Sequence, residues 1–181
     1  MKTRKHENTK KLKQSNHGFT ILEILVVIFI ITVGMVGVLS LIIQNIQVQY
    51  INKNILIASQ LSQEGLELIR NQRDNNFKSN QWYMYNIIEP DETNDLTIYF
   101  DGSEVVINYI DGGISNNATK LDIDENGYYT HEASQDSGFR RLITLENNEE
   151  EEFTRASSVV QWRVRGKINE YTAETILYDW R

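Results

Sequence analysis

The sequence predicts an α+β protein in which one long N-terminal helix is followed by an antiparallel sheet. Two changes of pattern along the chain carry this prediction. Twenty residues without a charge run from Ile24 to Ile43, and an amphipathic stretch follows them directly. After Pro90 the apolar residues recur at every second position, which is the period of half-buried strands. One helical part followed by a run of strands is typical of the α+β class.

Residues 1–18 form a basic leader that we expect to be separate from the fold. They hold six cations and one anion, a net charge of +5 that leaves −12 for residues 19–181 of a chain whose total is −7. The cations are Lys2, Arg4, Lys5, Lys10, Lys11 and Lys13. A basic flank before an apolar run is typical of the cytoplasmic end of a membrane helix. A solubilising tail or a nucleic-acid patch explains the charge but not the apolar run behind it.

The apolar run has the length of a membrane span. Twenty helical residues at about 1.5 Å each cover about 30 Å, the thickness of a bilayer core. A helix buried in a soluble domain is the alternative, but few such helices are apolar on every face. A secretory signal peptide carries its small-residue cleavage signal after the apolar run, whereas here Gly18 stands before it. We therefore expect residues 1–18 to be removed and residues 19–43 to remain as a transmembrane helix.

Residues 44–76 are predicted to continue the helix with an amphipathic pattern. Apolar or small residues recur at spacings of three and four, at Val48, Ile51, Ile55, Ala58, Leu61, Gly65 and Leu68. This stripe predicts a helix face packed on a sheet, and it lacks the sustained heptads of a coiled coil. We expect one helix from Phe19 to Arg73, ending at the turn residues Asp74-Asn75-Asn76.

Residues 77–181 are predicted to form a β-rich head. The expected strands are Leu96–Phe100, Val105–Ile110, Phe139–Leu145, Val160–Val164 and Tyr171–Trp180. Turns are expected at Asp101-Gly102-Ser103 and at Arg165-Gly166-Lys167, where glycine separates alternating runs. Short strands joined by such turns predict an antiparallel sheet.

The residues at the start of the apolar run resemble a known motif. Residues 18–39 read GFTILEILVVIFIITVGMVGVL, which is similar to the N-terminal signature of type IV prepilins and type II secretion pseudopilins. In that family a prepilin peptidase in the membrane cuts after the glycine, and the new N-terminal residue is N-methylated. The resemblance implies a cut between Gly18 and Phe19 and methylation of Phe19. It also implies a long helix packed on a sheet, and other pilin subunits and a membrane assembly platform as partners.

Glu23 stands at the acidic fifth position of the mature chain that the resemblance implies. In the family this carboxylate pairs with the α-amine of a neighbouring subunit and recruits it into the filament. A carboxylate in a membrane helix costs about 2.5–3.5 kcal/mol at the centre of the bilayer and less near the interface. Two other roles of Glu23 stay open: its side chain reaches the headgroups, or it stabilises the first helical turn against the macrodipole.

Three small residues within the apolar run indicate which kind of subunit the chain is similar to. They are Gly34, Gly37 and Ser40. Family members often have a glycine and a proline in this region, where the helix loosens inside the filament, and this chain has Ser40 at the usual proline position. Each glycine weakens the helix by about 1 kcal/mol, although small residues also permit close helix packing. This stretch is more similar to minor pilins and I-type pseudopilins than to major pilins.

The sequence offers little for catalysis, and we expect no enzyme. The chain has no cysteine, and His131 is the one histidine outside the leader. Glu149–Glu152 form an acidic run that is typical of a solvated loop. Neither a Gly-rich phosphate loop nor a nucleophile with a nearby base is evident.

One segment resembles the start of a calcium-binding loop. Asp122, Asp124 and Asn126 stand at alternate positions before Gly127, as the oxygen ligands of such a loop do. The twelfth position holds Ala133 instead of a bidentate glutamate. A turn between strands explains the same residues, so a calcium site and a plain turn stay open, and no other cofactor is expected.

The head also contains many aromatic and basic residues. The aromatic residues include Trp82, Tyr83, Tyr85, Tyr128, Tyr129 and Trp162. Most are expected in the core or in strand pairs, although an adhesive or DNA-contacting surface is the alternative. The net charge of −12 opposes nucleic-acid binding unless a local basic patch forms. The arginines available for one are Arg140, Arg141, Arg155, Arg163 and Arg165.

Together these features predict a structural subunit, minor or priming, of a type IV pilus or related filament. It would stand in the cytoplasmic membrane as a single-pass protein before assembly, and then in an extracellular filament or a periplasmic or cell-wall pseudopilus. A pseudopilin of a secretion or DNA-uptake system is one alternative. A membrane-anchored binding domain that never polymerises is another. The ligand of the head does not follow from the sequence.

Overall fold

The structure is a computed structural model of the 181-residue chain that describes residues 18–88, 93–148 and 153–179. The predicted leader therefore lies outside the described residues, except for Gly18. The chain divides into two compact units, Met1–Ile46 and Gln47–Arg181. Helix α1 (Ile21–Lys78) contributes to both units, and each unit is described by itself.

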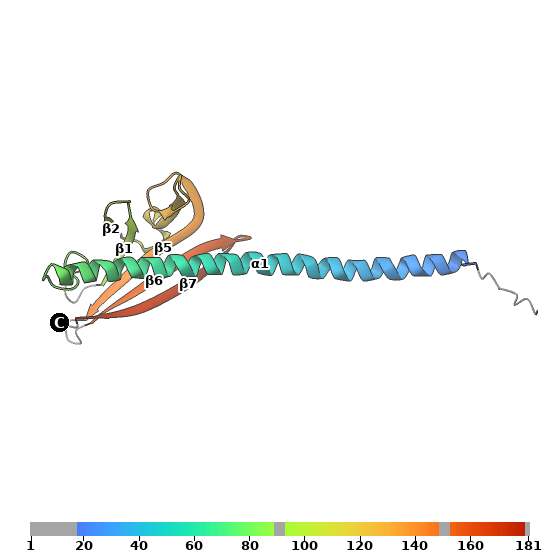
Figure 1. Cartoon of the computed structure of the whole chain (residues 1–181), viewed down its shortest axis with the longest axis horizontal. Helices are drawn as coiled ribbons and strands as arrows, with labels where there is room; N and C mark the ends of the chain where they lie inside the picture. The colour runs from blue at the N-terminus through green and yellow to red at the C-terminus, as the bar shows by residue number, and fades with distance from the viewer. Residues whose placement is uncertain (1–17, 89–92, 149–152, 180–181) are drawn as a thin grey trace, which may run out of the picture. The chain divides into compact units, whose positions relative to one another are not determined.

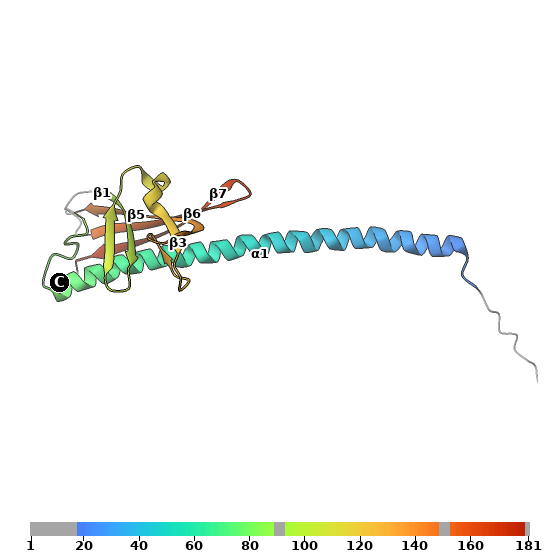
Figure 2. The same cartoon turned by 90° about the horizontal axis from the view of Figure 1, so that it is seen from above.

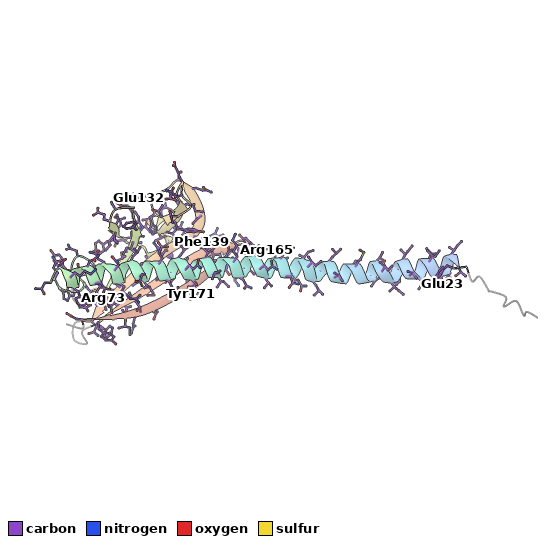
Figure 3. All side chains as sticks on the ribbon, in the orientation of Figure 1. Glu23, Arg73, Glu132, Phe139, Arg165 and Tyr171 are labelled. Atoms are coloured by element: carbon purple, nitrogen blue, oxygen red, sulfur yellow. The ribbon has the colours of Figure 1, made fainter. Side chains whose placement is uncertain are left out.

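In the first unit, α1 exposes every side chain, as the sticks along its first half in Figure 3 show. Its most apolar 18-residue window has a mean hydropathy of 3.0 and no buried residue. The two hydroxyl groups within the run bond to the helix itself: Thr32 donates to the Phe29 carbonyl and Ser40 to the Val36 carbonyl. Because both hydroxyls are satisfied, they suit a helix surrounded by lipid.

In the second unit, the apolar face of α1 differs in part from the predicted stripe. Ala58, Leu61 and Gly65 are buried as expected. Val48, Ile51 and Ile55 are exposed, because the core clusters of the head contact the helix only from Ile57 onward. The other buried helix residues, which the stripe did not include, are Asn54, Ser62, Leu66, Ile69, Asn76 and Phe77.

The predicted end of the helix was wrong, because α1 continues through Asp74-Asn75-Asn76 to Lys78. The Asn76 amide is buried and donates to the carbonyls of Tyr83 and Tyr85, at 3.1 and 2.9 Å. An asparagine that breaks a helix uses its side chain on its own backbone. Here the side chain instead bonds the loop that follows, so the backbone stays helical.

The described part of the head contains one seven-stranded antiparallel sheet (Figures 1 and 2). Its strands are β1 (Thr93–Phe100), β2 (Val105–Tyr109), β3 (Lys120–Ile123), β4 (Tyr129–Thr130), β5 (Gln135–Asn148), β6 (Phe153–Val164) and β7 (Lys167–Tyr178). Two short 3-10 helices, η1 (Gly113–Ser115) and η2 (Asn117–Thr119), precede β3. Strand β5 is central: β6 pairs along one edge, while β3 and β1 share the other.

The five predicted strands are confirmed, with different bounds, and the sequence did not predict β3 and β4. Strands β5 and β6 are longer than expected and pair over ten residues, from Phe139↔Trp162 to Asn148↔Phe153. The turn between β6 and β7 has positive φ at Arg165 and Gly166, which is the twist of a two-residue hairpin loop. The predicted end of the last strand at Trp180 lies outside the described residues.

Helix α1 packs on the sheet most closely at Gly65. A methyl group added there would lie 2.7 Å from Ile143 Cδ1, 3.2 Å from Arg141 Cδ and 3.3 Å from Ser158 Oγ. Next to it, the buried Ser62 hydroxyl donates to the Ser158 carbonyl on β6 at 2.8 Å. Glycine and serine therefore let the helix backbone approach β5 and β6 at the centre of the head.

Candidate functional site

The candidate site is the N-terminal segment from Gly18 to Glu23, where the helix begins. The Glu23 amide donates to the Thr20 hydroxyl at 3.2 Å, and the Ile24 amide donates to the Thr20 carbonyl at 3.2 Å. Thr20 is thus the N-cap residue, because its side chain satisfies a helix amide that has no partner within the helix. This cap fixes the start of α1 at Ile21, so Gly18 and Phe19 stand before the helix.

The Gly18–Phe19 peptide bond is accessible in this arrangement. Both residues are exposed and non-helical, and the Phe19 side chain is 79% exposed. A methyl group added at Gly18 would meet no atom within 4 Å. Exposed backbone outside regular structure is the form of chain that proteases cleave. The predicted cut therefore falls in exposed, non-helical backbone, and the cut itself stays a prediction.

Glu23 lies in the first turn of α1, with Phe19 four residues before it (Figure 3). A carboxylate in this turn is favoured by the partial positive charge of the helix N-terminus. Glu23 is exposed, and among the described residues it forms no ion pair. Its backbone amide, rather than its carboxylate, takes part in the cap.

A family model described as the prokaryotic N-terminal methylation motif matches residues 13–39. The matched range contains Gly18, Phe19, Glu23 and most of the apolar run. The chain thus has a type IV pilin-like prepilin motif. The motif includes the start of the long apolar helix α1, and an antiparallel sheet follows that helix. The match confirms the predicted resemblance to type IV prepilins but not the minor-pilin or pseudopilin subtype, and the helix followed by the sheet confirms the predicted α+β fold. Comparison with curated proteins and with solved structures gave no match.

The matched motif covers residues 13–39 and supports one class of protein. The match supports a type IV pilin-like subunit that a prepilin peptidase processes and that assembles with other pilin subunits. The helix that follows is long and apolar enough to cross a membrane, and it fits membrane anchoring before assembly. The matched motif is structural rather than enzymatic.

The predicted calcium loop forms the connection from β3 to β4. Asp122 lies on β3 opposite Thr130, while Asp124 begins the turn. One Asp124 carboxylate oxygen accepts the amides of Asn126 and Tyr128, at 2.9 and 2.8 Å. These backbone hydrogen bonds lower the Asp124 pKa. Because the carboxylate already accepts two amides, the geometry has the features of a turn, and the calcium site stays a prediction.

Arg141 does not belong to a surface patch. This corrects the prediction that all five arginines were available for a basic patch. Its side chain is fully buried and donates to the Leu61 carbonyl on α1 at 3.0 Å and to the Ile98 carbonyl on β1 at 2.6 Å. Glu64 Oε1 lies 3.6 Å from the guanidinium. Burial lowers the Arg141 pKa, and Glu64 offsets part of that effect. Arg141 therefore joins the helix to two strands.

His131 is mostly buried beside β3, with Nδ1 2.8 Å from the Lys120 carbonyl. Burial, and secondly the positive charge of Arg141, lower its pKa from 6.5 to about 4. The ring is therefore neutral at physiological pH, and Nδ1 donates to the carbonyl. This places His131 in the packing of the head rather than in chemistry at its surface.

The aromatic residues divide between the core and the surface. Tyr83 and Trp162 are buried, and the Trp162 ring packs 6.0 Å from that of Phe139. Tyr85 and Tyr128 are exposed. The prediction that most aromatic residues lie in the core is therefore confirmed for Tyr83 and Trp162 but not for Tyr85 and Tyr128.

Proposed function

We propose that this chain is a structural subunit of a type IV pilus or a related filament, cut between Gly18 and Phe19 and assembled through its apolar helix. The observation that carries the proposal is the first unit of the structure. The exposed Gly18–Phe19 bond, which we propose is the cleavage site, precedes a capped helix whose apolar side chains are all exposed from Ile21 to Ile46. A surface this apolar needs lipid or other subunits to cover it. A filament core of packed helices supplies that cover after the subunit leaves the membrane.

Glu23 is proposed to pair with the methylated α-amine of Phe19 on a neighbouring subunit. The pair suits an apolar filament core, because a charge with an oppositely charged partner costs much less there than a charge without one. In the described chain the Glu23 carboxylate has no cation of its own, which leaves it available for this role. The role as a minor or priming subunit rests on Ser40 in place of proline and stays part of the proposal.

The test compares Glu23→Val with Glu23→Asp in the full-length chain, expressed in cells that hold a prepilin peptidase and an assembly platform. Processing is read from the size of the membrane-bound protein, and assembly from the sheared extracellular or periplasmic filament fraction. We expect Glu23→Val to be processed but absent from filaments, whereas Glu23→Asp keeps the charge and part of the assembly. Normal assembly of Glu23→Val would refute the pairing. A chain that is neither cut nor assembled would instead be a plain membrane anchor.

A further inference from the structure

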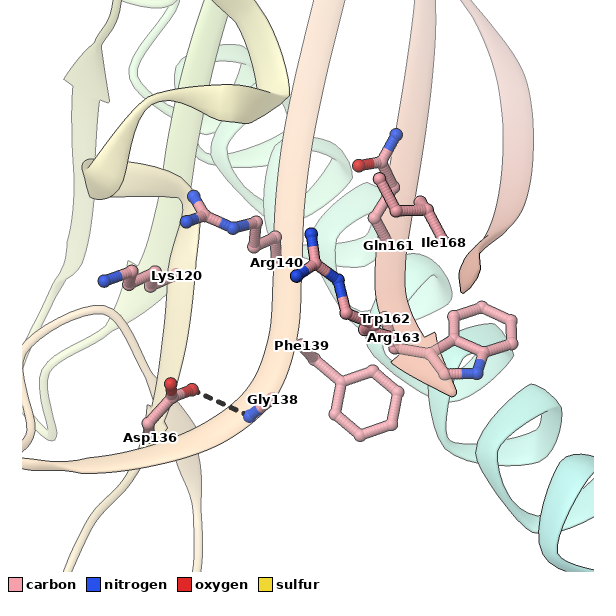
Figure 4. A pocket seen from close by; sticks show the side chains of 9 residues that line it. All are labelled: Lys120, Asp136, Gly138, Phe139, Arg140, Gln161, Trp162, Arg163 and Ile168. Atoms are coloured by element: carbon pink, nitrogen blue, oxygen red, sulfur yellow. Dashed lines mark hydrogen bonds between the residues drawn. The ribbon is translucent and has the colours of Figure 1, made fainter. Parts of the chain in front are cut away.

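A cleft of about 230 Å³ lies in the head beside β3, β5 and β6, and three cations line it (Figure 4). The cations are Lys120, Arg140 and Arg163, and the carboxylate in the lining is Asp136. The Asp136 side chain accepts the Gly138 amide at 2.8 Å, which is the dashed line in Figure 4. The cleft is therefore a positive site on a mature chain whose net charge is −12.

The strand register explains how the cations come together. Phe139 and Arg141 face α1, so Arg140 between them faces the opposite side of β5. Lys120 pairs with Arg140 across the β3–β5 ladder, and Gln161 pairs with Arg140 from β6. Arg163, two residues beyond Gln161, shares that face. Three strands, β3, β5 and β6, thus present their cations to one surface.

This arrangement has an electrostatic cost that the described chain does not offset. Like charges directly opposite on neighbouring strands are destabilising, and Lys120 and Arg140 are such a pair. Among the described residues, no ion pair includes Lys120, Arg140 or Arg163. Arg140 is held in place by the Asn116 carbonyl at 2.7 Å and the Thr119 hydroxyl at 3.2 Å. Local departures from favourable pairing are typical of functional sites.

The chain carries a complementary charge at the other end of the same ladder. Glu149–Glu152 join β5 to β6, directly after Asn148; they lie outside the described residues and enter here through their sequence. Nine residue steps separate Asn148 from Phe139 along β5, or about 30 Å at 3.3 Å per residue. The described residues that flank the acidic run, Asn148 and Phe153, therefore lie far from the cleft along the sheet of their own chain.

We propose that this cleft binds the Glu149–Glu152 segment of a second copy of the chain. The inference rests on the proposed function, because it assigns a contact between adjoining heads in the filament or its priming complex. A basic site at one end of the ladder and an acidic one at the other make a heterologous contact, in which each copy uses two different surfaces. Repetition of such a contact without ring closure gives an open helical assembly. The contact is electrostatic, so added salt weakens it over a Debye length of about 8 Å at 0.15 M.

Cysteine cross-linking in the full-length chain tests the contact directly, since the natural sequence has no cysteine. The double variant Arg163→Cys with Glu151→Cys is expected to give a ladder of disulfide-linked oligomers in the filament fraction. Arg163→Cys with Glu174→Cys is the matched control, because Glu174 is an exposed carboxylate in the middle of β7. The control is expected to give no ladder. A ladder from both pairs, or from neither, overturns the proposed contact.

Charge reversal supplies a second test that misfolding cannot imitate. Lys120→Glu with Arg163→Glu, and separately Glu150→Lys with Glu151→Lys, should each reduce filament yield at least tenfold. Cells that hold both sets of changes in one chain should recover most of the yield. Failure of this rescue, or normal yield from either reversed chain, contradicts the proposal. Loss of nucleic-acid binding with normal filament yield would assign the cleft to a polyanion instead.

These outcomes separate the two proposals. If the natural chain forms filaments but gives neither ladder nor rescue, only the docking contact is refuted. If the natural chain is never processed or assembled, the proposed function fails, and the docking contact fails with it.

Discussion

Because α1 lies so close to the sheet at Gly65, the variant Gly65→Ala tests both the sign and the size of a change in the free energy of unfolding. In an open helix, alanine is more stable than glycine by about 1 kcal/mol. At Gly65, however, the new methyl group would lie 2.7 Å from Ile143 Cδ1 and 3.2 Å from Arg141 Cδ. Overpacking of this kind costs about 1–3 kcal/mol. Displacing Arg141 also lengthens two charge-assisted hydrogen bonds, each with a net contribution of about 1.5–3 kcal/mol.

If overpacking and a partial weakening of the two hydrogen bonds outweigh the gain of about 1 kcal/mol from alanine, the free energy of unfolding of the head falls by about 1–3 kcal/mol, or its Tm by several degrees. The tryptophans all lie in the head sequence, so their fluorescence in detergent-solubilised full-length protein follows that unfolding. Gly37→Ala is the control, because its added methyl group meets no atom, and it should leave the head transition unchanged.

A second substitution identifies the clash. Ile143→Val removes the Cδ1 atom that the new methyl group would meet, and alone it costs about 0.5–1.5 kcal/mol. In combination with Gly65→Ala it should cost less than the two losses added together, since the two sites are in contact. Stabilisation of the head by Gly65→Ala, or strict additivity in the double variant, would refute the packing that we describe at this position.

Three further predictions concern the head. The pKa of His131 falls from 6.5 in the unfolded chain to about 4 in the folded one, so the unfolded state binds the proton first as pH decreases. Lowering the pH from 7 to 5 should therefore remove about 2 kcal/mol from the free energy of unfolding. The variant His131→Asn should abolish that part of the pH dependence. Asn76→Ala should lower the free energy of unfolding by about 2–3 kcal/mol, since two carbonyls lose a buried donor. The control Asn75→Ala, at an exposed residue, should change it by less than about 0.5 kcal/mol. If Asp124 belongs to a calcium site, millimolar calcium should raise the Tm relative to chelator, and an unchanged Tm would dismiss that site.

Long-range periodicity was sufficient to predict the main elements from the sequence. The uncharged run and the stripe behind it predicted α1, and alternation predicted most strands, because both patterns reflect which face is buried. The pairing of β5 with both β3 and β1 on one edge depends on contacts between distant residues, which no local pattern contains. The helix end was wrong because Asn76 bonds a loop carbonyl rather than its own backbone.

Two residues at the contact of α1 with the sheet carry a signal in the sequence that predicts their burial. Arg141 stands between Phe139 and Ile143 in the alternation of β5, which places it on the buried face despite its charge. Gly65 is the smallest residue of the helix stripe, and that is a signal of close approach. Their mutual contact could not be predicted, since it depends on how α1 crosses the sheet. The site residues Gly18, Phe19 and Glu23 needed no such knowledge, because they form a contiguous motif.

The central claim is tested most directly by the mass of the mature N-terminus. The chain is purified from membranes or filaments of cells that hold a prepilin peptidase, and its N-terminal peptide is sequenced by mass spectrometry. The account predicts a chain that begins at Phe19 with one methyl group on its α-amine. A Gly18→Ala variant, which keeps the basic leader and the helix, tests how far the cut depends on the glycine. A mature protein that retains Met1 and residues 1–18, although the peptidase is active, would contradict the claim.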